Sequence, residues 1–505
     1  LSDTDLSLEQ LTWGSKSAFR LSAQLGGGAS GSFSISGKIK VAPKGSSVWE
    51  SAIDAKISAK HIEAGHFWPY YRQHVPFKKI FGSVDAESDF QGRLKEFTSS
   101  GKISISALHF NYQPIFKQSL KSGLITLKYS MGLDAKDINV KALEAVIDGA
   151  GINGSCAIRD YRSSDPRITA QAVSSKFDYD KYKQFIPYGI IVKDTSEWIE
   201  QHVAGGIYQL DEGRLDGLVS QILHMEKGEN YNILYIRGRA EKGLVTYGQG
   251  VPTFNNIKGV LEMKGKDFFL HGMSGRFGES PMTLEGTITD YPLDKPSSYP
   301  FRMTISPGKS EIAWLLGSNK SKSLNYNGNS YMTLKGEGYT SGYNLSGEWN
   351  LTPADYSYSN FVKKPVNTVS AMSFKGSINP KEAVLSGLRY TLGELSVEMS
   401  AKYPFATTKT LDLVLNTNLF NMENISPFSP LLSTYQPAGR VQISARGKSR
   451  DPGMEEFGWQ GALSLTNAAF RYSPTEKPVS AITGTVSFEE KTMESSQLTA
   501  RVGST

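Results

Sequence analysis

Apolar and polar residues alternate with a period of two along most of this chain, and that pattern constrains the fold more than any other feature. Such alternation is typical of β-strands with one apolar and one polar face, as in antiparallel sheets. The apolar residues expected to share one face of their strands are Ile103, Ile105, Ile125, Leu127, Met282, Leu284, Ile288, Leu345, Leu395, Val397, Met399, Leu411, Leu413, Leu415, Val441 and Ile443.

Turn-forming pairs separate these runs, among them Asn153-Gly154, Asn327-Gly328 and Asn379-Pro380. The 49 Gly, 24 Tyr and 24 Phe also suit short strands and tight turns better than long helices. At roughly 10–12 residues per strand and turn, the chain holds on the order of 35–45 strands. The sequence therefore predicts an all-β protein with a long, curled antiparallel sheet and a few short helices.

The clearest helical stretch covers residues 194–206, where Asp194 is expected to cap the start and Gly205-Gly206 to end the helix. A second, weaker stretch covers residues 310–317. Residues 63–71 and 422–432 predict short helices interrupted by prolines.

An internal repeat accompanies these helices. Each helical stretch precedes a strand bracketed by glycines, and the leading glycines are Gly82, Gly206, Gly328 and Gly439. Their separations are 124, 122 and 111 residues. The spacing predicts quasi-repeats of about 110–125 residues, as in solenoid proteins.

The repeat divides the chain into five segments. Residues 1–61 form a partial N-terminal repeat, which is followed by repeats at residues 62–181, 182–308 and 309–421 and by a truncated repeat at residues 422–505. A second motif leads through Gly259 to Arg276 and Gly278, and through Gly484 to Arg501 and Gly503. Because the later copy stops at Thr505, we expect the array to continue beyond this residue.

A sheet with one apolar face must bury that face, and short helices cannot cover so many strands. Either the sheet packs against itself as a sandwich or barrel, or it curls into a groove that receives an apolar ligand. Periodicity alone favours self-packing, because that is the commoner arrangement. An outer-membrane barrel is disfavoured, because helices interrupt the strands and aromatic girdles are not evident.

Composition narrows the function. A net charge of +6 over 505 residues does not indicate nucleic-acid binding. The single cysteine, Cys156, excludes an internal disulfide and a cysteine-cluster metal site, and it is expected to be a small buried side chain. No run of eighteen apolar residues is present to span a bilayer as a helix.

Chemical sites are weakly indicated. His61, His66 and His74 fit no standard zinc spacing, so neither a metal nor another cofactor is expected. The chain lacks a nucleophile elbow, a phosphate loop and a zinc-protease motif, and we therefore expect no enzyme activity. The basic pair Lys78-Lys79 is compatible with anionic headgroups, although a solvated surface explains it equally well.

Two stretches resemble the AsmA-like family of Gram-negative bacteria, particularly its large YhdP/TamB-like members. One runs from residues 185–188 through 195–199 to Gly205-Gly206. The other runs from residues 467–472 through Pro478 and Gly484 to Gly503. The motifs are loose patterns of glycine, proline and aliphatic residues, and none is a catalytic signature.

The resemblance implies a long β-sheet curled into a repeating, taco-like groove with a hydrophobic interior. It also implies a periplasmic protein that an N-terminal helix outside this chain anchors to the inner membrane. The expected function is transfer of phospholipids between the inner and outer membranes, with the alternating apolar residues touching acyl chains. The principal alternative is a structural or adhesive β-repeat protein with a self-packed core and no lipid.

Overall fold

The computed structural model describes residues 2–9, 12–25, 31–73, 80–113, 115–186, 188, 193–317, 323–405, 410–449, 457–473, 476–495 and 497–503. Strands make up 63% of the protein and helices 11%. One antiparallel sheet contains 29 strands and does not close into a barrel, and a second sheet contains 3 strands. The prediction of an all-β fold with a long antiparallel sheet and few short helices is confirmed.

The chain forms two compact units, and their division passes through β14 (Phe254–Lys264) and β15 (Asp267–Phe277). The other strands of unit 1 are β1 (Ser2–Leu8), β2 (Lys16–Leu25), β3 (Gly31–Lys40), β4 (Ala52–Glu63), β5 (Phe81–Arg93), β6 (Glu96–Phe110), β7 (Leu120–Leu133), β8 (Ile138–Ile147), β9 (Ala150–Arg159), β10 (Arg167–Ser174), β11 (Phe177–Asp178), β12 (Val203–Leu218) and β13 (Leu234–Val245).

The strands of unit 2 are β16 (Ser280–Ile288), β17 (Phe301–Ile305), β18 (Leu324–Gly328), β19 (Tyr331–Tyr339), β20 (Gly342–Asn350), β21 (Ala354–Tyr358), β22 (Val362–Lys364), β23 (Ser370–Ile378), β24 (Glu382–Leu392), β25 (Leu395–Pro404), β26 (Leu411–Thr417), β27 (Phe420–Asn421), β28 (Ala438–Ser449), β29 (Phe457–Phe470), β30 (Val479–Glu489), β31 (Thr492–Glu494) and β32 (Thr499–Val502). Strands β18, β21 and β22 form the separate small sheet.

The helices are short. The α-helices are α1 (Trp68–Tyr71), α2 (Tyr179–Tyr182), α3 (Lys193–His202), α4 (Val219–Ile222), α5 (Lys309–Leu316), α7 (Met422–Ile425) and α8 (Pro430–Ser433). The 3-10 turns are η1 (Val48–Glu50), η2 (Ala64–Phe67), η3 (Lys183–Phe185), η5 (Asn230–Ile233) and η6 (Ser426–Phe428). Within the described ranges, no helix is long and apolar enough to cross a membrane.

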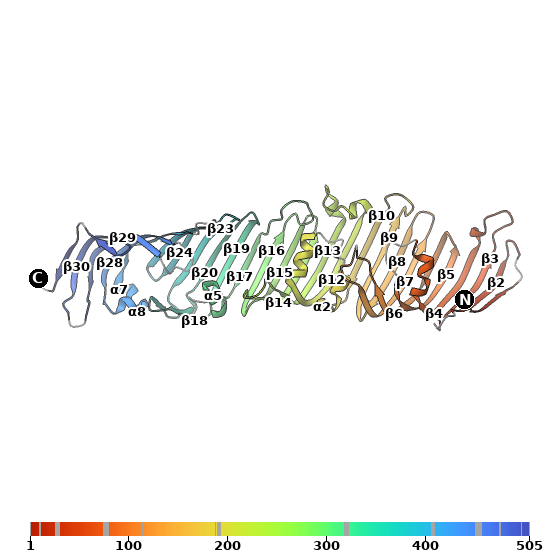
Figure 1. Cartoon of the computed structure of the whole chain (residues 1–505), viewed down its shortest axis with the longest axis horizontal. Helices are drawn as coiled ribbons and strands as arrows, with labels where there is room; N and C mark the ends of the chain where they lie inside the picture. Colours follow the sequence, from red (N-terminus) through yellow and green to blue (C-terminus); the bar gives the residue numbers. More distant parts are fainter. Residues whose placement is uncertain are drawn as a thin grey trace. The chain divides into compact units, whose positions relative to one another are not determined.

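Most of these helices lie at one edge of the sheet in each unit, which we call the helical edge (Figure 1). Alternate connections of an antiparallel ladder meet at the same edge. In unit 1 the helical edge carries α1, between β4 and β5, and both α2 and α3, between β10 and β12. In unit 2 it carries α5, between β17 and β19, and both α7 and α8, between β26 and β28.

The expected helices are found, with one correction. Helix α5 ends at Gly317, whose φ of 80° suits the C-terminal position of a helix. Helix α3 begins at Lys193 and ends at His202, so Asp194 lies inside the helix rather than capping it. Gly205-Gly206 were expected to end this helix but belong to β12, which pairs with β13. Strand β12 therefore begins at Val203, before the glycine pair that was expected to separate it from the helix.

Three of the four leading glycines lie at β-bulges. Gly82, Gly206 and Gly439 have φ values of 137°, 133° and 81°, and the register of their strands shifts at each of them. The fourth, Gly328, ends β18 with a φ of 90°. Positive φ is readily accessible to glycine, and a bulge bends its strand. The leading glycines thus mark bends next to the helical edge, while the five-segment repeat stays a prediction.

Candidate functional site

An extended chemical feature of unit 2 is an uncharged row of side chains, which we call the central row. Its members are direct partners on successive strands from β16 to β30. The central row consists of Leu284, Met303, Leu334, Gly347, Phe374, Leu388, Met399, Leu415, Ala445, Gly461 and Phe488. At about 4.8 Å per strand, the row extends for roughly 50 Å.

A parallel row, called the flanking row, lies two residues away along each strand from β16 to β29, or three residues away at the bulge in β24. It consists of Gly286, Phe301, Gly336, Leu345, Gly376, Leu385, Ala401, Leu413, Gly447 and Trp459. No member of either row carries a charge, and together they form the central part of the apolar face of unit 2.

Part of this apolar face is covered by the protein itself. On the helical-edge side, Met282, Ile305 and Met332 are only 5–7% exposed. The next residues in that row, Trp349, Met372 and Tyr390, pack against the buried cluster formed by α5 and the small sheet. Helix α7 and η6 pack in the same way on β25 and β28. A strip near the helical edge is therefore closed.

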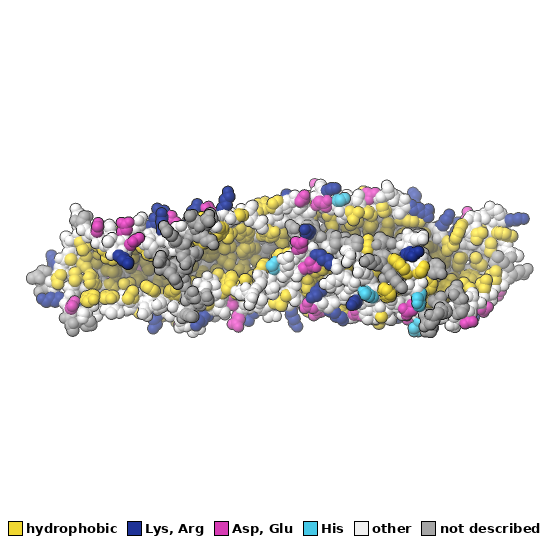
Figure 2. All heavy atoms as spheres, in the orientation of Figure 1, with side chains coloured by type: hydrophobic (Ala, Val, Ile, Leu, Met, Phe, Trp, Pro, Cys, Tyr) yellow, Lys and Arg dark blue, Asp and Glu magenta, His cyan; other side chains and the backbone are white. Residues whose placement is uncertain are grey.

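The central row itself is open. Its large side chains, including Phe374, Leu388 and Leu415, are half-buried rather than buried. Ile378, at the other end of the same face of β23, is 51% exposed. Figure 2 shows hydrophobic side chains lining a hollow over β23–β28 in unit 2 and another over β2–β4 in unit 1. The apolar face therefore lines an open groove in each unit.

Unit 1 has a comparable uncharged row. It runs from β3 to β12 and consists of Ile39, Ile53, Gly92, Phe97, Leu133, Ile138, Ile158, Ile168 and Gly217. Cys156 lies on the same face, opposite Val140 and Ala170, and is half-buried instead of buried. Tyr179 of α2 covers Tyr208 on this face, with ring centroids 5.9 Å apart.

The apolar face of unit 1 contains a cluster of three hydroxyl groups. Ser88 lies 2.9 Å from Ser99 and 2.7 Å from the Tyr129 hydroxyl, oxygen to oxygen. Ser99 and Tyr129 are 3.2 Å apart. The three contacts form a closed triangle, and the Ser88 hydroxyl also donates to the Asp89 carbonyl at 3.4 Å. The hydroxyl cluster is therefore an internally paired polar spot in the lining of unit 1.

The sequence-predicted residues lie on these apolar faces, where the structure gives their partners. Ile103 pairs with Leu127, and Ile105 with Ile125, in unit 1. In unit 2, Leu284, Met399 and Leu415 belong to the central row, and Leu345 and Leu413 to the flanking row. Five further residues lie on the same face nearer the helical edge, namely Met282, Leu395, Val397, Val441 and Ile443. Leu411 lies beyond Leu413 on the same face and pairs with Ser449, and Ile288 lies at the end of β16.

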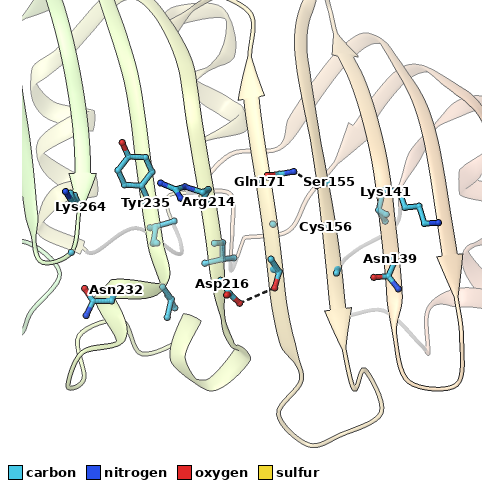
Figure 3. A pocket seen from close by; sticks show the side chains of 18 residues that line it. Asn139, Lys141, Ser155, Cys156, Gln171, Arg214, Asp216, Asn232, Tyr235 and Lys264 are labelled. Carbon is cyan, nitrogen blue, oxygen red and sulfur yellow. Dashed lines mark hydrogen bonds between the residues drawn. The ribbon is translucent and has the colours of Figure 1, made fainter.

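The opposite face carries the charges. In unit 2 the row beside the central row includes Glu348, Arg389 and Glu398. In unit 1, Arg167 donates to Asp216 at 2.7 Å, and this ion pair holds the pKa of Asp216 below its ordinary value. A polar hollow of about 820 Å³ lies on this face, lined by Ser155, Gln171 and their neighbours (Figure 3).

The lining of this polar hollow is internally paired. Gln171 donates to Ser155 at 3.0 Å, and Thr169 donates to Asp216 at 3.1 Å (Figure 3). Arg214 contacts a glutamate of its own strand at 2.8 Å and lies over the Tyr235 ring. These pairings are those of a solvated outer surface, so the polar hollow is a weaker candidate than the apolar face.

The weaker sequence candidates acquire no common site. Within the described ranges, no cluster of three or more His, Cys, Asp or Glu side chains is suited to a metal ion. The His61 backbone N–H donates to Asp85 at 2.8 Å, whereas His74 and Lys78-Lys79 lie outside the described residues. Trp198 of α3 and Trp314 of α5 are each 41% exposed. The Trp314 ring lies 5.6 Å from that of Phe277, so it does contact the sheet.

Comparison of the chain with protein-family models and with curated proteins finds no match. The resemblance to AsmA-like proteins therefore stays a prediction.

Proposed function

We propose that the chain binds phospholipids by their acyl chains along the apolar faces of its two units. The observation that supports this most strongly is the central row, which is uncharged across successive strands and whose large side chains are only half-buried. An exposed apolar stripe of this length would be costly in water without a ligand or partner. A phospholipid tail is flexible and unbranched, and it matches a long, narrow apolar surface.

The energetics favour such a role. Each methylene group that leaves water contributes about 0.8 kcal/mol, so a chain lying along several strands gains many kcal/mol without any specific polar contact. The headgroup can stay in water at the open side of the groove. No nucleophile or metal ion is needed, because the protein would shield the lipid and leave it chemically unchanged.

The proposal extends to cellular role through the resemblance alone. We propose that the chain belongs to a periplasmic conduit that carries phospholipids between the inner and outer membranes, attached through segments outside this chain. The structural or adhesive alternative draws support from the closed strip, where Ile312, Tyr326 and Leu351 pack on the sheet instead of leaving it open. The two functions differ in what contacts the central row.

Lipid analysis of the chain, purified under native conditions without detergent, tests this proposal. We expect at least one phospholipid per chain by mass spectrometry. An environment-sensitive fluorophore on Cys156, the single cysteine, gives a second readout, because this side chain lies on the apolar face. Its emission should shift to the blue when phospholipid vesicles are added. A folded chain that carries no lipid and shows no shift would support the self-packed alternative.

A further inference from the structure

The three phenylalanines of the central and flanking rows each have a glycine as a direct partner on the preceding or following strand. Phe374 faces Gly347, Phe301 faces Gly336, and Phe488 faces Gly461. Glycine within a strand lowers stability, because it raises the conformational entropy of the unfolded chain and provides no side chain to pack in the folded one. Three such pairs on one apolar surface therefore require a physical reason.

The Phe374 ring occupies the space that a side chain at position 347 would fill. A Cβ atom on Gly347 would lie 2.5 Å from Cε1 of Phe374 and 2.9 Å from Cδ2 of Leu334. A Cβ on Gly461 would lie 2.7 Å from Cζ of Phe488. The ring in each pair thus lies across the neighbouring strand, over the glycine backbone, instead of standing upright on the sheet.

The pair at Gly336 follows the same arrangement. A Cβ atom there would overlap Cε1 of Phe301 and the hydroxyl of Tyr343. The rings of Phe301 and Tyr343 are nearly parallel, with 14° between their planes and 6.5 Å between their centroids. The Tyr343 hydroxyl donates to the carbonyl of Tyr299 at 2.7 Å, which fixes its ring.

We infer that these glycines seat the aromatic rings and so level the floor of the apolar groove in unit 2. The inference rests on the proposed lipid binding and specifies how the ligand is held: as an unbranched hydrocarbon chain with no fixed position along the row. An upright ring would divide the row into compartments, and each barrier would have to be crossed by a moving chain. A level floor of similar apolar contacts lets the chain shift by one methylene at little cost.

The glycine at position 347 provides the sharpest test, because the three atoms nearest to its added Cβ belong to side chains alone. Gly347→Ala should displace the Phe374 ring from its seat without obstructing the backbone. The matched control is Gly387→Ala in β24, which faces Lys375 and whose Cβ would meet nothing within 4 Å. The double variant Gly347→Ala/Phe374→Ala removes the displaced ring.

Each full-length variant is assayed for bound phospholipid by native mass spectrometry. The exchange of a pyrene-labelled phospholipid between chain and vesicles gives the rate. We expect Gly347→Ala to keep its lipid content but to exchange roughly threefold to tenfold more slowly, as a ring forced from its rotamer would cause. Gly387→Ala should exchange at the rate of the unmodified chain, and the double variant should exchange faster than Gly347→Ala, because it no longer carries the displaced ring.

A further variant keeps the test independent of folding at Gly347. Leu388→Phe adds a ring to the central row opposite Phe374 and Met399, where no glycine is available to seat it. It should slow exchange in the same way. Unchanged exchange in both folded ring variants would overturn the inference, whereas an unmodified chain that carries no lipid would refute the proposed function itself.

Discussion

Replacing Leu413 with Asp places a carboxylate in the flanking row, between Ala401 and Gly447. An acyl chain lying along the row would have to desolvate this charge or leave the surface. With strands about 4.8 Å apart, about four methylene groups pass each strand. At about 0.8 kcal/mol each, their loss removes roughly 3 kcal/mol of binding, a decrease of more than a hundredfold in local affinity.

The neighbouring residue provides the control. Val414 lies on the opposite face of β26, between Ser400 and Arg446, so Val414→Asp introduces the same charge into the same strand on the polar side. Because Leu413 is half-buried, its replacement should leave the protein folded at a cost of about 1–2 kcal/mol. Urea unfolding of both variants checks this point before any lipid measurement.

The assay is lipid extraction from fluorescent phospholipid vesicles, together with lipid content after native purification. We expect Leu413→Asp to lose most of the extraction activity and Val414→Asp to retain it. Equal lipid content and equal extraction by the two folded variants would refute the reasoning, because binding would then not depend on the apolar face.

Three further predictions concern stability. The Glu311 carboxyl is buried, and burial alone would raise its pKa above the ordinary value of 4.5. Hydrogen bonds, including one of 2.5 Å from Ser280, outweigh burial and lower the pKa. The ionised carboxylate should therefore stabilise the fold above about pH 4.5, and this stabilisation should be lost as the pH falls through the pKa of the folded state. Urea unfolding against pH should show a smaller loss in Glu311→Gln than in the unmodified chain, because other carboxyls with lowered pKa values, such as Asp216, remain in the variant. Gly439→Ala should cost about 3 kcal/mol or more by thermal unfolding, since φ is 81° and β29 blocks the new Cβ; Gly45→Ala, at a φ of 92° in open space, should cost only about 1 kcal/mol. Lys364→Met should cost about 2–4 kcal/mol in urea unfolding, because the buried ammonium donates to three backbone carbonyls, and a loss below 0.5 kcal/mol would contradict that role.

Much of the apolar face could be predicted from the sequence, because alternation is a local property. The strands around Ile103, Leu127 and Leu413 each separate apolar from polar residues within a few positions, and the pleat of a strand converts this directly into two faces. The short helices were predictable for the same reason, since caps and breakers are local signals.

The rows across strands could not be predicted, because pairing register is not local. Gly347 and Phe374 are 27 positions apart, and no pattern in either strand indicates that the ring lies over the glycine. The hydroxyl cluster of Ser88, Ser99 and Tyr129 was missed in the same way. Self-packing and an open groove were equally beyond prediction, because the covering of the apolar strip depends on where α5 and the small sheet fold back.

The bulges explain how the apolar faces persist through strands whose alternation is interrupted. In β24, Leu385 and Leu388 are three residues apart, and simple alternation would place them on opposite faces. The register shifts between them, so that Leu385 faces Ala401 and Leu388 faces Met399, both on the apolar side. Strand β8 does the same with Val140 and Leu143. Each bulge places two residues instead of one between two apolar residues of its strand, so that both apolar residues stay on the same face. The apolar rows therefore stay unbroken while the sheet bends. Alternation in the sequence and bulges in the structure therefore act together, and what they jointly maintain is the continuity of the apolar surface.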